Sequence, residues 1–251
     1  TFRRYAEKII RTLMAHVQHH PAIIGWQLDN ETKHYDNIGR YMQEGFVRSL
    51  QEKYPDLRQL NHDFGLDYWS NRIDRWQDFP PVENTINASL ACAFSRYQRQ
   101  QVTEYLAWQA AIVREYAQPH QFVTHNFDFE WRGYSYGVQP RVDHFAAAQA
   151  LDIAGVDIYH PSQAHLTGRE IAFGGAIARS LKPGQNYFVL ETQAQGFAQW
   201  TPFPGQLRLQ AFSHIASGAA MVSYWHWHSI HNAFETYWKG LLSHDFSRNP
   251  T

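Results

Sequence analysis

Apolar residues follow two patterns along this chain, helical spacing and short continuous runs. Positions spaced by about 3.6 residues predict helices over residues 2–19, 38–53, 88–117, 141–150, 168–180 and 206–217. Continuous apolar runs between them predict strands over residues 23–28, 122–127, 153–159, 187–193 and 220–227. Strands that are apolar along their whole length are typical of a parallel sheet covered by helices. The pattern therefore predicts an α/β fold.

Polar side chains gather where the predicted strands end. They are Asn30, Glu31, Asn126, Asp128, Asp157, Tyr159, Glu191, Gln193, His226 and His228. A (β/α)8 barrel places its active site at the carboxyl ends of its strands, and a doubly wound open sheet binds ligands at the same edge. The sequence has no glycine-rich phosphate loop, because Gly174 and Gly175 lie inside a predicted helix. Both architectures predict a polar site at this edge of the sheet.

The number of strands is too small for a complete barrel. A full (β/α)8 TIM-type barrel has eight units in about 250 residues, whereas five strands occupy this whole chain. We expect residues 1–251 to form one partial catalytic barrel domain that holds strands 4 to 8, with strands 1 to 3 upstream of Thr1. The aromatic stretch 54–87 is predicted to be an irregular insertion, and so long a connection is usually functional.

Composition narrows the classes of function. Lys and Arg total 22 and Asp and Glu total 23, so a net charge of −1 gives no electrostatic basis for binding nucleic acid or an anionic membrane. The sequence contains no apolar run near the roughly 20 residues of a membrane span. The single cysteine, Cys92, cannot form a disulfide within the chain, and its apolar context predicts a core position. Aromatic residues make up 16%, which fits either an aromatic core or flat surfaces for sugar rings.

Several segments resemble the glycoside hydrolase family 42 β-galactosidases. HPAIIGWQLDNE at residues 20–31 closely resembles the acid/base segment of that family. The resemblance continues, in the family's order, through FVRSLQEKY at 46–54, LN at 60–61, YWS at 68–70, VTHNF at 123–127, AGVDIYHP at 154–161, LETQ at 190–193 and YWHW at 224–227. The resemblance implies a retaining glycosidase that cleaves terminal β-D-galactosides.

Glu31 and Glu191 are the candidate catalytic residues, and each follows an apolar strand run. The resemblance implies that Glu31, after strand 4, is the general acid/base and that Glu191, at strand 7, is the nucleophile. If the five predicted strands are strands 4 to 8, residues 23–28 form strand 4 and residues 187–193 form strand 7, in agreement with the resemblance. The alternatives are a glutamate near a helix N-cap for Glu31 and a salt bridge to an arginine for Glu191. Retention requires carboxyl groups about 5–5.5 Å apart, against about 6.5–9.5 Å for inversion.

Six further residues are candidate substrate contacts. They are Asn30, Tyr159, Trp200, Glu235, Trp69 and His228. Asn30 is expected to bind the sugar 2-hydroxyl, with a helix N-cap as the alternative. The resemblance implies that Tyr159 holds the nucleophile, and the alternative is a packing role. The two tryptophans offer flat faces for a sugar, and Glu235 offers acceptors for galactose hydroxyls.

The histidines at the end of the chain have two interpretations. His226 and His228 share one face of a predicted strand, and His231 follows closely. Three histidines can bind zinc. The resemblance instead favours a substrate contact or a structural role for His228, because the family uses no catalytic metal.

The resemblance also bears on cofactors, partners and location. We expect no cofactor and no metal, since residues 32–36 lack the cysteine cluster that binds structural zinc in many members. The expected partners are a β-galactoside oligosaccharide or small galactoside and, for the full-length protein, two further copies in a homotrimer. A cytoplasmic location is expected. Two alternatives stay open: a related glycosidase acting on another β-linked sugar, such as an arabinoside or fucoside, and a catalytically incompetent carbohydrate-binding fragment.

Overall fold

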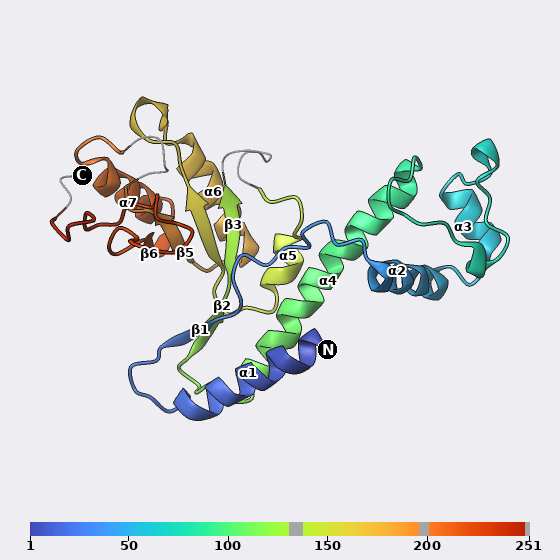
Figure 1. Cartoon of the computed structure of the whole chain (residues 1–251), viewed down its shortest axis with the longest axis horizontal. Coiled ribbons are helices and arrows are strands. Elements are labelled where there is room, and N and C mark those ends of the chain that lie inside the picture. The colour runs from blue at the N-terminus through green and yellow to red at the C-terminus, as the bar shows by residue number, and fades with distance from the viewer. Residues whose placement is uncertain (131–137, 196–200, 249–251) are drawn as a thin grey trace. The chain divides into compact units, whose positions relative to one another are not determined.

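The computed structural model describes residues 1–130, 138–195 and 201–248. Two compact units are present, one formed by residues 1–32 and 104–251 and the other by residues 33–103. The first unit contains the parallel strands, and the second contains short helices (Figure 1).

The first unit alternates strands and helices. In chain order it contains α1 (Phe2–Val17), β1 (Gly25–Gln27), the end of α4 (Ala88–Arg114), β2 (Phe122–Thr124), β3 (Asn126–Glu130), α5 (His144–Ala148), β4 (Gly155–Tyr159), the 3-10 turn Gln163–His165, α6 (Arg169–Leu181), β5 (Tyr187–Gln193), α7 (Gln206–Ala216) and β6 (Ala219–Trp225). The five strand positions predicted from the sequence are therefore confirmed, with the predicted bounds at β5 and bounds that differ by a few residues at the others.

All strand pairs are parallel. β1 pairs with β2, and β3, β4, β5 and β6 form a four-stranded sheet in sequence order. The register places Asp157 of β4 opposite Glu191 of β5, next to an irregularity in the β4–β5 ladder. Strand-to-strand order along the chain with helical crossovers is the arrangement of a barrel wall.

The predicted strand 122–127 is wrong in one respect, because it is divided at His125 between the two sheets. The backbone N–H of Leu28 donates to the carbonyl of Thr124 at 2.8 Å, which ends the pairing with β1. The buried His125 ring then binds the carbonyl oxygen of Leu28 at 2.6 Å. The His125 side chain thus takes the carbonyl that the next backbone hydrogen bond of the ladder would use.

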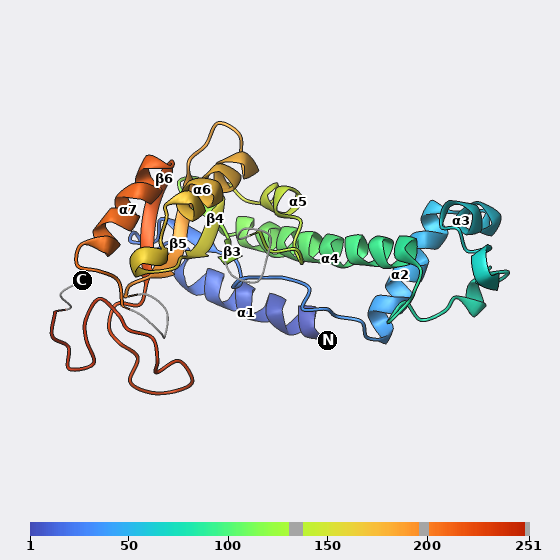
Figure 2. The ribbon, with the colours of Figure 1, turned by 90° about the horizontal axis from the view of Figure 1, so that it is seen from above.

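Helices α6 and α7 pack beside each other and against strands β4 and β6 (Figure 2). Gly174 and Gly175 make this close approach possible. A Cβ on Gly174 would lie 2.3 Å from Cδ1 of Ile158, and one on Gly175 would lie 2.8 Å from the hydroxyl of Tyr187. This pair is a packing device inside α6, in agreement with its predicted helical position.

Helix α1 lies alongside the 104–114 part of α4 (Figures 1 and 2). The guanidinium of Arg11 forms a salt bridge with Glu115, with Nη2 donating to Oε1 at 3.0 Å. The rings of Phe2 and Tyr105 lie 6.1 Å apart between their centroids. Several apolar residues of α1 nevertheless remain exposed, including Ile9 and Leu13.

The second unit consists of α2 (Arg40–Lys53), α3 (Leu57–Asp63), the 3-10 turns Tyr68–Ser70 and Trp76–Asp78, and the first part of α4. Its core is formed by Phe46, Leu50, Leu60, Val82 and Phe94.

The prediction that residues 54–87 are irregular is wrong over α3. The Asp56 carboxylate accepts from the backbone N–H of Arg58 at 2.9 Å and caps the helix. Cys92, expected in the core, is exposed on α4. Leu90 and Phe94 are the buried residues of this part of the helix, and Cys92 lies on another face.

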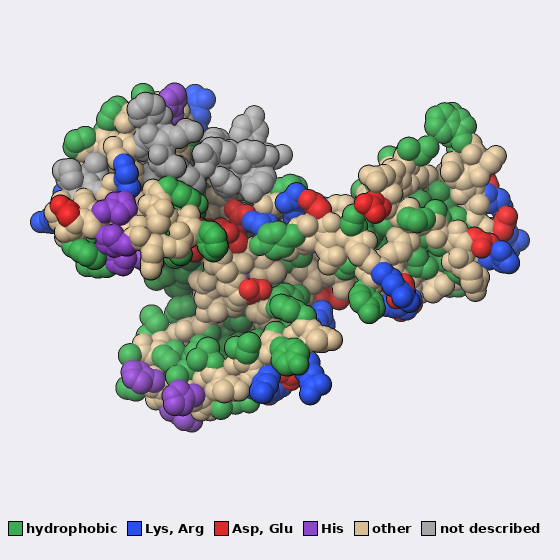
Figure 3. All heavy atoms as spheres, viewed as in Figure 1, with side chains coloured by type: hydrophobic (Ala, Val, Ile, Leu, Met, Phe, Trp, Pro, Cys, Tyr) green, Lys and Arg blue, Asp and Glu red, His purple; other side chains and the backbone are tan. Residues whose placement is uncertain are grey.

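The described residues contain no helix whose length and apolar character would allow it to cross a membrane. On the face shown in Figure 3, acidic and basic side chains of the described residues are interspersed rather than gathered by sign. This distribution agrees with the nearly balanced composition.

Candidate active site

Three carboxyl groups meet where the parallel strands end. Glu31 follows β1, Asp157 lies in β4 and Glu191 lies in β5. One oxygen from each carboxyl lies within 4.8 Å of the others. The two predicted catalytic glutamates, 160 residues apart in sequence, are therefore neighbours in space.

Glu191 is half-buried and held by Tyr159. The Tyr159 hydroxyl donates to Oε2 of Glu191 at 2.8 Å. Burial raises the pKa of Glu191, the Tyr159 hydrogen bond opposes that rise, and the charges of Glu235 and Asp128 add to it. The pKa of Tyr159 is itself raised by burial and by Glu191, so its hydroxyl keeps its proton and acts as the donor.

Glu31 lies in a loop after β1 that His125 and Asn126 hold in place. Its backbone N–H donates to Oδ1 of Asn126 at 3.3 Å. The N–H of Thr32 donates to Nε2 of His125 at 3.3 Å. Glu31 has a φ of +44°, in the left-handed region that non-glycine residues rarely adopt. Such backbone strain persists where surrounding bonds hold it, and it is concentrated at functional sites.

His125 is neutral and its tautomer is fixed. Its Nδ1 donates to the carbonyl of Leu28 at 2.6 Å, which leaves Nε2 to accept from Thr32. Burial lowers the pKa of His125 to about 4. The ring therefore positions the loop before and after Glu31 without adding charge to the site.

Asn126 connects four groups of the site through one amide. Its Nδ2 donates to Oδ1 of Asn30 at 2.8 Å and to Oδ2 of Asp157 at 2.5 Å. Its Oδ1 accepts from Nε2 of Gln27 at 3.0 Å and from the backbone of Glu31. Asn126 and Asp157 were seen in the sequence only as polar residues at strand ends. The signal that could have selected them is a polar residue inside an otherwise apolar buried strand.

The remaining predicted contacts divide into three groups. Glu235 and His228 line one pocket of about 660 Å³ together with Trp225 and Phe234. Trp69 belongs to the 33–103 unit, where it is 73% exposed and stacks on Tyr68 at 5.0 Å between ring centroids. Trp200 lies outside the described residues.

The histidines predicted at the end of the last strand, His226, His228 and His231, follow β6 rather than lie in it, and they do not converge on one point. Within the described ranges, Glu31, Asp157 and Glu191 are the only set of three potential metal-binding side chains whose ligand atoms lie within 4.8 Å of one another. His226 and His228 instead bind backbone carbonyls through Nδ1, each at 2.7 Å, and His228 stacks on His231. Converging carboxyl groups alone do not identify a metal site.

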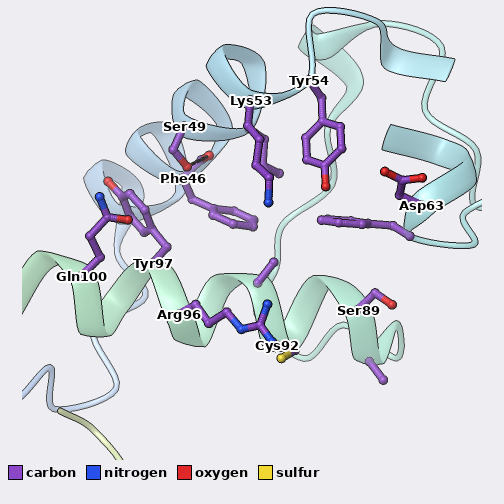
Figure 4. Close-up of a pocket in the computed structure, with 14 residues that line it drawn as sticks. Phe46, Ser49, Lys53, Tyr54, Asp63, Ser89, Cys92, Arg96, Tyr97 and Gln100 are labelled. Atoms are coloured by element: carbon purple, nitrogen blue, oxygen red, sulfur yellow. Dashed lines mark hydrogen bonds between the residues drawn. The ribbon is translucent and has the colours of Figure 1, made fainter. Parts of the chain in front are cut away.

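The 33–103 unit has its own pocket of about 560 Å³ between α2, α3 and α4 (Figure 4). Phe46 and Phe64 form part of its wall, and Lys53 and Arg96 reach toward it. Asp63 is the single carboxylate in its lining, and it already accepts from Nε2 of Gln59 at 2.6 Å. This pocket lacks a pair of carboxyl groups, so the two-carboxylate chemistry belongs to the strand ends.

Comparison with known proteins decides the family. The family model of glycoside hydrolase family 42, described as β-galactosidase, matches residues 1–251. This chain belongs to that family. Among curated relatives, β-galactosidase BgaH of Haloferax lucentense is 29% identical over 98% of the chain and 39% of its own length, and a Thermus thermophilus β-galactosidase is 30% identical over 96% of the chain and 40% of its own length.

Solved structures of the same family show the fold. A β-galactosidase from Marinomonas ef1 superposes with a TM-score of 0.85 at 24% identity, covering 99% of this chain and 40% of that one. One from Halorubrum lacusprofundi gives 0.87 at 24% identity, covering 99% and 39%. The family 42 chain thus spans about two fifths of the length of these relatives. The predicted incomplete (β/α)8 barrel is confirmed.

Proposed function

We propose that the family 42 protein containing this chain is a retaining glycosidase that removes terminal β-D-galactose, with Glu31 as acid/base and Glu191 as nucleophile. The observation that supports this proposal most is the approach of the two carboxyl groups within 4.8 Å, with Tyr159 bonded to Glu191. The names of the relatives support the choice of β-galactosides.

The first step forms a covalent sugar–enzyme ester. A carboxylate oxygen of Glu191 attacks the anomeric carbon while the bond from that carbon to the leaving oxygen breaks, and Glu31 gives its proton to that oxygen. Asn30 donates to the 2-hydroxyl, a contact that strengthens as the ring gains oxocarbenium character. The Tyr159 hydroxyl keeps the second oxygen of Glu191 in place.

The second step restores both carboxyl groups. Glu31, now ionised, takes a proton from water, and the water oxygen attacks the anomeric carbon. The ester bond to Glu191 breaks and its electron pair returns to the carboxylate. Two inversions at one carbon leave the product with the configuration of the substrate. Glu235 and His228 line a pocket of their own, and the proposal assigns them contacts with sugar hydroxyls.

Trimeric assembly and a cytoplasmic location are further proposals that come from the family resemblance alone. Size-exclusion chromatography with light scattering on the full-length protein tests the assembly. Fractionation of its native host tests the location.

The test of the mechanism is a pair of variants with an external nucleophile. Glu191→Ala and Glu31→Ala are assayed in the full-length protein on an aryl β-D-galactoside, with Glu83→Gln, an exposed glutamate of the other unit, as the control. Azide should rescue both variants. In Glu191→Ala, azide attacks the anomeric carbon directly with one inversion and gives the α-galactosyl azide. In Glu31→Ala, azide attacks the glycosyl-enzyme, so two inversions give the β-galactosyl azide.

Other outcomes separate the alternatives. A β-azide from Glu191→Ala would contradict the assignment of the nucleophile. Hydrolysis of aryl arabinosides or fucosides faster than the galactoside would replace the substrate class and keep the mechanism. Binding of galactose without turnover in the wild type would indicate a carbohydrate-binding protein.

A further inference from the structure

Asp157 is the third carboxyl of the site, and the two-step reaction gives it no role. It is completely buried in β4. Its Oδ2 accepts from Nδ2 of Asn126 at 2.5 Å. Its Oδ1 is buried as well and has no hydrogen-bond partner among the residues that the structure describes. A buried carboxylate usually gathers several donors or a cation, and Asp157 has one amide.

The charged groups that face Asp157 are all acidic. Glu191 faces it from β5, Glu31 from the loop after β1, and Asp128 from β3. The hydroxyl of Tyr159 is the other titratable group nearby. Burial, and after it the charges of Glu191 and Glu31, raise the pKa of Asp157 to about 9. Three ionised carboxyl groups within 4.8 Å would repel one another, so one buried member retains its proton at neutral pH.

We propose that Asp157 stays a neutral carboxylic acid throughout the reaction and is a positioning residue that acts through Asn126. With the proton on Oδ1, the carbonyl oxygen Oδ2 remains the acceptor for Asn126. That bond fixes the Asn126 amide, which in turn holds Oδ1 of Asn30 and the backbone of Glu31. The role in catalysis rests on the proposed function, whereas the protonation state does not.

A neutral Asp157 explains how a carboxyl can lie so near the two catalytic groups. It places a hydrogen-bond acceptor behind Asn126 without adding a second negative charge beside Glu191. An ionised Asp157 would oppose the ionisation of Glu191, which must be an anion to attack. The neutral acid therefore supplies the geometry of a carboxylate without its charge.

The protonation state is tested by infrared spectroscopy on this chain, without substrate. The wild type at pH 7 should show the carbonyl stretch of a protonated carboxylic acid, and the difference spectrum against Asp157→Asn should assign that band to Asp157. The band should persist up to about pH 8 and fade near pH 9. Its absence from the difference spectrum at pH 7 would overturn the proposal, whether or not the protein hydrolyses galactosides.

The positioning role is tested by two variants of the full-length protein. Asp157→Asn keeps an acceptor for Asn126 and no charge, so kcat should remain within about threefold of wild type and both limbs of the pH profile should stay in place. Asp157→Ala removes the acceptor, so kcat should fall by roughly 10- to 100-fold with little change in KM, since Glu31 and Asn30 lose their alignment. Asp157→Asn thus serves as the conservative rescue.

The pH profile separates this role from an ionised Asp157. If Asp157 were an anion in the wild type, Asp157→Asn would remove a charge within 4.8 Å of both glutamates, and the limbs would move to lower pH by roughly 2.5 units at an effective dielectric constant of about 20. Such a movement would overturn the proposal, as would full activity in a folded Asp157→Ala. Circular dichroism confirms the fold of each variant.

Discussion

Replacing Tyr159 by Phe should move the low-pH limb of kcat/KM upward by about one pH unit. The change removes the hydroxyl that donates to Oε2 of Glu191 at 2.8 Å and keeps the ring that packs on Trp238 at 5.4 Å between centroids. A hydrogen bond to an ionised group contributes about 1.5–3 kcal/mol. Glu191 is half-buried, so we use the lower end of this range, about 1.5 kcal/mol, which corresponds to about 1.1 pH units at about 1.36 kcal/mol per unit.

The sign follows from the form that the hydroxyl stabilises. Tyr159 donates to the carboxylate, so it lowers the pKa of Glu191 against the rise caused by burial. Without it the pKa rises further, and the nucleophile is ionised only at higher pH. At pH values below the wild-type limb, the rate should fall about tenfold, whereas the high-pH rate should change less.

The assay is a pH series of kcat/KM for an aryl β-D-galactoside with the full-length protein. Tyr187→Phe is the matched control, because it removes a buried tyrosine hydroxyl that has no hydrogen-bond partner among the described residues. Tyr187→Phe should leave the limb in place. A limb that is unchanged in Tyr159→Phe, or that moves to lower pH, would refute the assigned contact.

Three further predictions concern stability. Burial lowers the folded pKa of His214 to about 4 and the unfolded chain binds the proton first, so His214 alone should weaken folding between pH 6.5 and about 4 by on the order of 3 kcal/mol. Since His125 and Asp157 titrate in both proteins, the measurement is the difference in urea midpoint between wild type and His214→Gln, and a difference that is equal at pH 7 and pH 5 would contradict the prediction. Gly155→Ala should cost about 2 kcal/mol, since its Cβ would lie 2.7 Å from the backbone oxygen of His125, whereas Gly39→Ala, with its nearest atom at 3.9 Å, should leave the melting temperature unchanged. Asp56→Ala should remove the cap of α3 and cost about 1 kcal/mol in urea unfolding, and an unchanged midpoint would show that the cap is dispensable.

The sequence predicted the strands of the barrel wall because each is a continuous apolar run with a polar end. Residues 187–193 are an example, since a strand that is covered on both faces has few polar positions to confuse the pattern. The family resemblance then selected Glu31 and Glu191, and the structure brings them together. Their catalytic roles stay predictions until the variants are measured.

The features that the sequence did not give depend on what lies opposite a residue. The break at His125 requires the carbonyl of Leu28, 97 residues away in sequence, to take the ring as its partner. The short helix α3 follows Pro55 and has only two turns, so its periodicity is too brief to recognise. Asp157 reads as an ordinary polar residue at a strand end, and only the neighbouring Glu31 and Glu191 make its burial unusual.

The amide of Asn126 determines which half of Asn30 can meet a ligand. An asparagine amide has two hydrogens and two lone pairs, and at Asn126 all four are engaged. One of its hydrogens is donated to the oxygen of Asn30 and the other to Asp157, so the Asn30 amide cannot turn over without setting two NH2 groups against each other. A hydroxyl that approaches the Nδ2 side of Asn30 consequently meets N–H groups and must offer a lone pair, which fixes the direction of that hydrogen bond before any ligand arrives.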